Sequence, residues 1–242
     1  MVRGIDSFRE WFRGYESSYV VIGGTACDLL MGEAGEDFRV TRDIDMVLIV
    51  ESLSAKIGSR IWDYVKEAGY EQRYKSSGNP EYYRFIKPKS LDYPSMIELF
   101  TRRIEGITLP PDATLTPLPI DDEVSSLSAI LLDDEYYDFL LAGTAISNGI
   151  SVLGASYMIP FKAKAWLDLS ERRAKGEHVQ RRHIRKHKND IVRLSALLSP
   201  EVRMILPNKI AGDMAKFFNE VDEPDKFVRA AAAYDLSDIL QR

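Results

Sequence analysis

Residues 20–32, with the sequence VVIGGTACDLLMG, constrain the fold of this chain more than any other segment. An apolar run stops at Gly23 and Gly24, and a stretch of small and apolar residues follows directly, with Thr25 near a helix-capping position. Glycines between a strand and a helix let an anion approach the backbone amides and the positive end of the helix. The segment therefore predicts a strand, a turn and a helix, and the turn is either an ordinary connection or a phosphate site.

The segment TRDIDMVLIV, residues 41–50, is the most strand-like stretch of the chain and carries two acids near its start. Alternate side chains of a strand share a face, so Asp43 and Asp45 are expected to project together, about 7 Å apart at the backbone. Such a pair is costly unless a cation lies between the carboxylates, and Mg²⁺ with bound phosphates suits these oxygen ligands. A solvated strand end is the alternative, and the preceding glycine turn favours the metal site.

Glu98, in the segment MIELF at residues 96–100, is a lone acid between apolar residues on another predicted strand. It is a candidate third carboxylate for the same site. Three carboxylates can hold two metal ions, which activate an attacking hydroxyl and stabilise a leaving pyrophosphate in two-metal phosphoryl transfer. We therefore expect Asp43, Asp45 and Glu98 to act as catalytic metal ligands for Mg²⁺ or Mn²⁺.

The rest of the chain predicts two parts, at residues 1–122 and 123–242. Helical spacing of apolar residues predicts helices at 5–15 and 54–69, and strands are expected at 82–88 and 95–103. The boundary is placed at TLPPDATLTPLP, residues 108–119, because its four prolines favour a linker or an extended segment.

The second part is predicted to begin with short strands and to continue as helices. Strand or hairpin elements are expected at residues 126–133, 135–143 and 149–153, with a turn at SNG. From Pro160, placed in the first turn of a helix, the chain is predicted to be mainly helical to its end.

Residues 171–193 concentrate positive charge in a chain whose formal net charge is −5. The stretch contains nine Lys and Arg residues against three acids. It could neutralise a triphosphate or follow the backbone of an RNA acceptor, and a solvated helix face is the alternative. A protein that coats nucleic acid with its whole surface is disfavoured by the overall negative charge.

The order of these motifs resembles the nucleotidyltransferase (DNA polymerase beta-like) superfamily. There, a strand ending in Gly-Gly or Gly-Ser is followed by a helix and by a strand with Asp-x-Asp, as in IGGTACDLL and RDIDMVLIV here. Farther along, MIPFKAKAWLDL and IRKHKNDIVRL are similar to the Lys-bearing and Lys-x-Asp helices of the AbiEii/AbiGii toxin branch. The resemblance spans about residues 18–195. It implies an α/β (α+β) fold, with a nucleotidyltransferase-like mixed β-sheet flanked by helices and a mainly helical C-terminal half.

The resemblance also implies roles for individual residues. Gly23, Gly24 and Thr25 would cradle the triphosphate, and Asp43 and Asp45 would bind metal. The helical half would complete the site with Lys162 or Lys164, Lys188 and Asp190, the last as a candidate base or as a structural partner of Lys162. Eighteen residues separate Gly24 from Asp43, which is longer than the usual interval in the superfamily and requires a longer loop beside the site.

These observations predict an Mg²⁺-dependent nucleotidyltransferase that moves NMP from an NTP to an acceptor hydroxyl. The resemblance implies a toxin of a type IV toxin–antitoxin or phage-defence system, with a cognate antitoxin as protein partner. The basic stretch favours an RNA, tRNA-like acceptor at residues 172–193. Two alternatives remain open: a small-molecule nucleotidyltransferase of the antibiotic-modifying kind, and a non-catalytic nucleotide-binding interaction module.

The sequence also bears on where the protein acts. The charged N-terminal segment is unlike a signal peptide, and no run of about 18 apolar residues is present. The single cysteine, Cys27, cannot form an internal disulfide and fits a reducing compartment. A soluble, cytoplasmic protein with no membrane partner is expected.

Overall fold

The computed structural model describes residues 2–52, 54–74, 80–100, 130–131, 133–201 and 203–241. The chain divides into two compact units, one of Met1–Asp122 with Thr144–Leu153 and the other of Glu123–Gly143 with Gly154–Arg242. The predicted boundary after residue 122 and the proline-rich segment 108–119 lie outside the described residues. The segment Thr144–Leu153, which the sequence placed with the helical half, belongs to the first unit.

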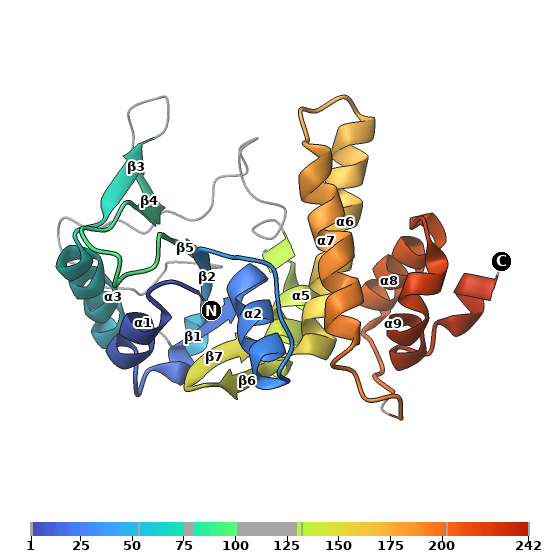
Figure 1. Cartoon of the computed structure of the whole chain (residues 1–242), viewed down its shortest axis with the longest axis horizontal. Coiled ribbons are helices and arrows are strands. Elements are labelled where there is room, and N and C mark those ends of the chain that lie inside the picture. The colour runs from blue at the N-terminus through green and yellow to red at the C-terminus, as the bar shows by residue number, and fades with distance from the viewer. Residues whose placement is uncertain are drawn as a thin grey trace. The chain divides into compact units, whose positions relative to one another are not determined.

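A mixed sheet of seven strands organises the first unit, in the order β3-β4-β5-β2-β1-β7-β6 (Figure 1). Strand β1 is antiparallel to β2 and parallel to β7, and β2 is parallel to β5. The strands are β1 (Tyr19–Ile22), β2 (Asp43–Leu48), β3 (Glu71–Tyr74), β4 (Pro80–Ile86), β5 (Met96–Phe100), β6 (Thr144–Ser147) and β7 (Ile150–Leu153). The mixed sheet confirms the predicted α/β class.

Three α-helices accompany the sheet within the described part of the first unit: α1 (Ile5–Trp11), α2 (Gly23–Glu33) and α3 (Ala55–Ala68), with 3-10 turns η1 (Glu16–Ser18) and η2 (Val50–Ser52). The ring of Phe8 on α1 meets that of Tyr19 on β1 edge-on, with centroids 5.6 Å apart. Trp62 on α3 meets Phe85 on β4 in the same way at 5.7 Å. Aromatic contacts of this geometry join α1 and α3 to one face of the sheet.

The second unit is helical, as predicted. Its described elements are α5 (Asp134–Ala142), α6 (Ala155–Ala174), α7 (Arg181–Ser195), α8 (Asn208–Glu220), η3 (Pro224–Phe227), α9 (Val228–Ala233) and η4 (Ser237–Gln241). Helices α6 and α7 run side by side (Figure 1). Phe161 on α6 and Ile191 on α7 are both fully buried.

The prediction of a strand at residues 135–143 is wrong, because this segment forms α5. The tyrosines and branched residues have strand propensity, but their burial follows a helical period, with Tyr136, Tyr137, Phe139 and Leu140 inside. The side chain of Asp133 caps the helix by accepting a hydrogen bond from the Tyr136 amide at 3.4 Å. Tertiary burial and this cap outweigh strand propensity.

The neighbouring expectations have mixed outcomes. In the segment 126–133, predicted as a strand, Ile130 and Leu131 are helical, whereas residues 126–129 and 132 lie outside the described part. The strand expected at 149–153 is confirmed as β7.

Helix α6 begins five residues before Pro160, which was predicted to lie in its first turn. A proline inside a helix has no amide hydrogen to donate to the carbonyl four residues earlier, here that of Ser156. The Tyr234 hydroxyl donates to this carbonyl oxygen at 2.5 Å. The tertiary contact with Tyr234 therefore supplies the hydrogen bond that Pro160 cannot make.

Within the described residues, none of the helices combines the length and apolar character that crossing a membrane requires.

Candidate functional site

Strand β1 passes directly into α2 at Gly23, the first residue of the helix, whose φ of +72° favours glycine. The glycine turn expected between the two elements, Gly23 and Gly24, is thus the start of α2. A Cβ atom on Gly23 would lie 1.9 Å from Oδ2 of Asp45. Asp45 is held there because it pairs with Ile22, the last residue of β1, across the antiparallel β1–β2 ladder. The structure thus brings the predicted glycine turn into contact with the predicted acidic pair.

The loop after α2 covers the second glycine of the turn. A Cβ atom on Gly24 would lie 2.6 Å from Oγ1 of Thr41 and 3.2 Å from Nη2 of Arg39. This is the long loop that the interval between Gly24 and Asp43 predicted. The sequence analysis did not identify Arg39. Its position in the loop that follows a candidate phosphate-binding turn could have pointed to it, because arginine is a common phosphate ligand.

Thr25 connects the start of α2 to the start of β2. Its side chain is fully buried, and its Oγ1 donates a hydrogen bond of 2.6 Å to the backbone oxygen of Asp43. The hydroxyl therefore fixes the position of the first acid relative to the glycine turn. Direct contact between Thr25 and a phosphate stays a prediction.

The three predicted carboxylates share one face of the sheet. Strands β2 and β5 pair in parallel, and the register sets Asp45 beside Glu98 and Asp43 beside Met96. Residues paired in this way point to the same face, and Asp43 and Asp45 share a face because they are two residues apart. The sequence could predict the alternation within β2, whereas only the sheet register shows that Glu98 is on the adjacent strand.

Glu98 has an ion-pair partner that the sequence analysis did not identify. Nε and Nη2 of Arg84, on β4, each lie 2.5 Å from Oε1 of Glu98, and only 8% of Glu98 is exposed. Arg84 is the one basic residue of the segment YYRFI, which was the signal available for it. Because Arg84 balances the charge of Glu98, a third metal ligand at this position would have to share its oxygen atoms with the guanidinium.

The donor set fits a magnesium ion best through Asp43 and Asp45. In the described ranges, no group of three or more His, Cys, Asp or Glu residues is arranged to hold a metal ion. Mg²⁺ nevertheless usually binds one or two carboxylates and completes its shell with water and substrate phosphates. The metal assignment of Asp43, Asp45 and Glu98 stays a prediction, and its strongest part is the aspartate pair.

In the second unit, Lys162 and Asp190 form a buried ion pair between α6 and α7. Nζ of Lys162 lies 3.1 Å from Oδ2 of Asp190, and neither side chain is exposed. Asp190 is thus the structural partner of Lys162, one of its two predicted roles. For either residue to touch a nucleotide, this part of the unit would have to open, and those contacts stay predictions.

The other two predicted lysines also pair with acids of the second unit. Nζ of Lys164 lies 3.0 Å from Oδ1 of Asp213, and Nζ of Lys188 lies 2.7 Å from Oδ1 of Asp222 and 3.1 Å from Oε2 of Glu223. Burial lowers the pKa of Lys188, but Asp222 and Glu223 outweigh it and raise this pKa above the ordinary value. Binding of Lys164 or Lys188 to a nucleotide stays a prediction.

Comparison with known proteins bears on the fold. No protein-family model and no curated protein matched the chain. An antigenic nucleotidyltransferase-like protein from Paracoccidioides brasiliensis has a similar structure, with a TM-score of 0.52 and 15% sequence identity over 98% of this chain and 95% of that one. The antibiotic-resistance factor ANT(2'')-Ia matches with a TM-score of 0.38 and 14% identity, over 88% of this chain and 89% of its own. The first likeness shows that this chain has a nucleotidyltransferase-like fold.

Proposed function

We propose that this chain is an Mg²⁺-dependent nucleotidyltransferase that moves NMP from an NTP to an acceptor hydroxyl. The observation that carries the proposal is the contact between Gly23 and Asp45, with 1.9 Å between the position of a Cβ and the carboxylate oxygen. It joins a turn suited to phosphate to a carboxylate suited to metal, in a chain with a nucleotidyltransferase-like fold.

The chain's own residues would have separate tasks in this reaction. Gly23 and Gly24 let the triphosphate approach the start of α2, and the Arg39 guanidinium adds positive charge beside Gly24. Asp43 and Asp45 would hold Mg²⁺, with Glu98 as a third ligand where Arg84 permits. The bound metal supplies charge stabilisation for the attacking hydroxyl and the leaving pyrophosphate.

The residues of the second unit have supporting tasks in the proposal. Lys162 and Asp190 hold α6 and α7 together through their buried pair. Lys164 and Lys188 are the cations proposed to reach the triphosphate, because each keeps part of its side chain exposed, 31% and 12% respectively.

An RNA acceptor suits residues 171–193 best, because nine Lys and Arg against three acids provide the charge that a phosphate backbone requires. With the resemblance to the AbiEii branch, this supports a toxin of a type IV toxin–antitoxin or phage-defence system. Such a toxin would act in the cytoplasm and would be held in check by a cognate antitoxin protein.

Incubation of the chain with each α-labelled NTP, Mg²⁺ and total RNA tests the proposal. We expect labelled RNA, and we expect Asp43→Asn or Asp45→Asn to abolish the label, since each removes a metal ligand. Asp63→Asn is the matched control, because Asp63 is an exposed aspartate on α3 of the same unit. Transfer that persists in both site variants would refute the assignment.

The same assay separates the alternatives. Label that appears on aminoglycosides or lincosamides in place of RNA would favour a small-molecule nucleotidyltransferase. Calorimetry with NTP and Mg²⁺ addresses the non-catalytic module, for which binding should survive both aspartate substitutions without any product.

A further inference from the structure

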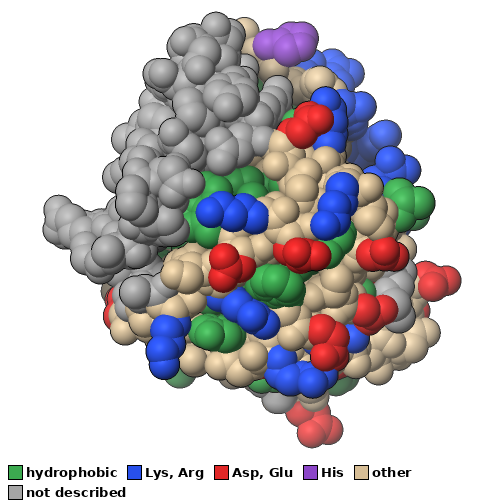
Figure 2. Space-filling view, turned by 90° about the vertical axis from the view of Figure 1, so that its left-hand side faces the viewer, with side chains coloured by type: hydrophobic (Ala, Val, Ile, Leu, Met, Phe, Trp, Pro, Cys, Tyr) green, Lys and Arg blue, Asp and Glu red, His purple; other side chains and the backbone are tan. Residues whose placement is uncertain are grey.

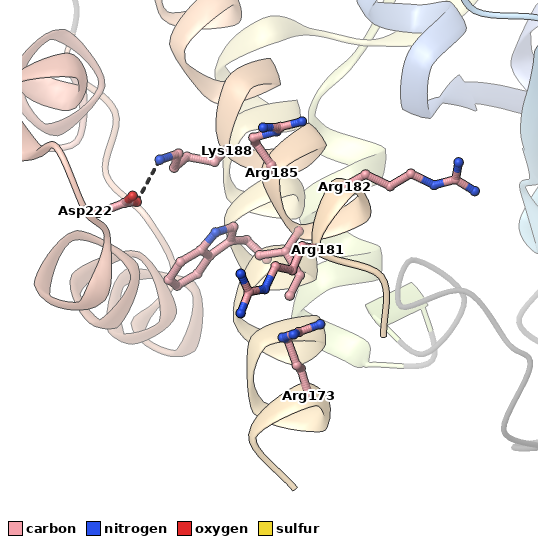
Figure 3. A pocket seen from close by; sticks show the side chains of 8 residues that line it. Arg173, Arg181, Arg182, Arg185, Lys188 and Asp222 are labelled. Atoms are coloured by element: carbon pink, nitrogen blue, oxygen red, sulfur yellow. Dashed lines mark hydrogen bonds and ion pairs between the residues drawn. The ribbon is translucent and has the colours of Figure 1, made fainter. Parts of the chain in front are cut away.

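The second unit contains a cavity of about 380 Å³ beside α6 and α7 (Figure 3). This volume is within the range of roughly 300–1,000 Å³ that is usual for small-molecule sites. Its lining consists of five cations, one acid, one aromatic ring and one aliphatic side chain: Arg173, Arg181, Arg182, Arg185, Lys188, Asp222, Trp166 and Ile184. No residue of the glycine turn or the aspartate pair contributes to it.

One stripe of α7 forms most of the cavity wall. Arg181, Ile184, Arg185 and Lys188 follow the spacing of three, four and seven residues that sets side chains on one helix face. Another face of α7 packs inward through Asp190 and Leu194, which are fully buried. The cavity stripe is therefore a separate basic face of the helix.

The positive charge of this stripe is only partly balanced within the described part of the chain. Lys188 points toward Asp222 and pairs with it (Figure 3), and Nη1 of Arg173 donates to the backbone oxygen of Val179 at 2.7 Å. Arg181 and Arg185, by contrast, have no ion pair with any described residue. Two guanidinium groups on the cavity thus keep their hydrogen-bond donors available for a ligand.

Arg181 and Arg185 lie near the N-terminus of α7, where positive charge destabilises an isolated helix. Arg181 is the first residue of α7, and the first turn contains no acid and has no side-chain cap. Cations near a helix N-terminus are repelled by the positive end of the helix dipole. Burial, followed by the charges of Arg182 and Lys186, lowers the pKa of His183, as expected in a positive potential. A bound anion would relieve this repulsion.

The excess of positive charge around the cavity also differs from the mixed charge on the face of the molecule shown in Figure 2. On the face of the molecule in Figure 2, Lys and Arg lie interspersed with Asp and Glu over much of the described surface. Around the cavity, five cations accompany one acid. A single-sign cluster around a concave site focuses the potential and attracts anions.

We propose that this cavity binds the phosphate groups of a nucleotide ligand, at a site separate from the glycine turn. Arg181 and Arg185 would bind phosphate oxygens through the paired donors of their guanidinium groups. Trp166 and Ile184 would form the apolar wall against the rest of the ligand. The inference stands on the cavity and its charges, and it does not depend on catalysis at Asp43 and Asp45.

Phosphate groups of this kind belong either to a free nucleoside triphosphate or to a nucleic acid chain. We would titrate the full chain, without Mg²⁺ and at fixed salt, with ATP, with inorganic tripolyphosphate and with a 10-nucleotide single-stranded RNA. Arg181→Ala combined with Arg185→Ala should weaken binding of the bound ligand by about tenfold or more. Binding of ATP or tripolyphosphate identifies a free phosphate ligand, and binding of the RNA alone identifies a nucleic acid.

The matched control is Lys56→Ala combined with Lys216→Ala, which removes the same charge from exposed positions that lie outside residues 171–193 and do not line the cavity. This variant should bind within about twofold of the unaltered chain. Thermal unfolding of each variant confirms that it is folded. Absence of binding by all three ligands, or an equal loss in the control pair, would overturn the proposal. Either result could coexist with active transfer at the glycine turn, so the cavity and the transfer reaction fail independently. Absence of RNA binding would also count against the RNA acceptor proposed for residues 171–193.

Discussion

Nζ of Lys162 and Oδ2 of Asp190 lie 3.1 Å apart in the second unit, and neither side chain is exposed to solvent. A buried charge is tolerated when an opposite charge and hydrogen bonds replace its water. The pair joins α6 to α7, and the residues beside it in the chain, Phe161 and Ile191, are fully buried. It therefore fixes how the two helices pack.

Substitution of one residue of this pair should lower the free energy of unfolding more than substitution of both. Lys162→Met or Asp190→Leu alone removes one partner of the buried ion pair and should lower the free energy of unfolding by about 3–5 kcal/mol. The double variant should recover much of that loss, because it leaves no buried charge. Urea unfolding of the three variants measures this, and single losses that simply add would show that the two charges are not coupled.

Alanine substitutions at Gly23 and Gly32, which lie at opposite ends of α2, should change the stability of the protein in opposite directions. Gly23→Ala adds a Cβ 1.9 Å from the Asp45 carboxylate at a φ of +72°, and the backbone strain alone should destabilise by about 1–3 kcal/mol. Gly32→Ala meets nothing within 4 Å and should stabilise the helix by about 0.5–1 kcal/mol. Thermal unfolding distinguishes them, and a Gly23→Ala variant as stable as the unaltered chain would contradict the observed contact.

The contribution of Thr25 to stability should come from its hydroxyl group rather than from the volume of its side chain. Thr25→Val keeps the volume but removes the 2.6 Å hydrogen bond to the Asp43 backbone oxygen, and should lower the free energy of unfolding by about 1–2 kcal/mol. Thr25→Ser retains the donor and should stay closer to the original stability. Chemical denaturation of both variants tests this, and equal losses would point to packing of the methyl group.

The cap of α5 should make stability depend on acidic pH. Burial raises the pKa of Asp133, but hydrogen bonds from Lys209 and the Tyr136 amide outweigh it and hold this pKa below the ordinary 3.8. The ionised carboxylate therefore favours the folded state above pH 3.8, and this contribution is lost as pH falls through the lower folded-state pKa.

Asp133→Ala should lower the free energy of unfolding by about 1 kcal/mol at pH 7, since it removes the cap. The difference between the variant and the unaltered chain should shrink as the pH falls below 3.8. Denaturation at a series of pH values provides the measurement, and a difference that stays constant with pH would exclude the ionised cap as its cause.

Local pattern determined the elements that carry the first part of the site. The apolar run before Gly23 and the small residues after it predicted the end of β1 and the start of α2, and the alternation in DIDMVL predicted β2. These elements are short-range consequences of side-chain period and glycine geometry. The same rules failed at residues 135–143, where tyrosines favoured a strand but one-sided burial and the Asp133 cap produced α5.

The sequence by itself thus determined the strand–turn–helix, the acidic strand and the helical character of the second half. Tertiary structure decided that Asp45 contacts Gly23, that Glu98 lies on the adjacent strand with Arg84, and that Lys162 is buried against Asp190. It also decided that the segment Thr144–Leu153 joins the sheet of the first unit. The reason is physical: helical and strand periods act within a few residues, whereas strand order, register and buried charge pairing depend on residues distant in the chain.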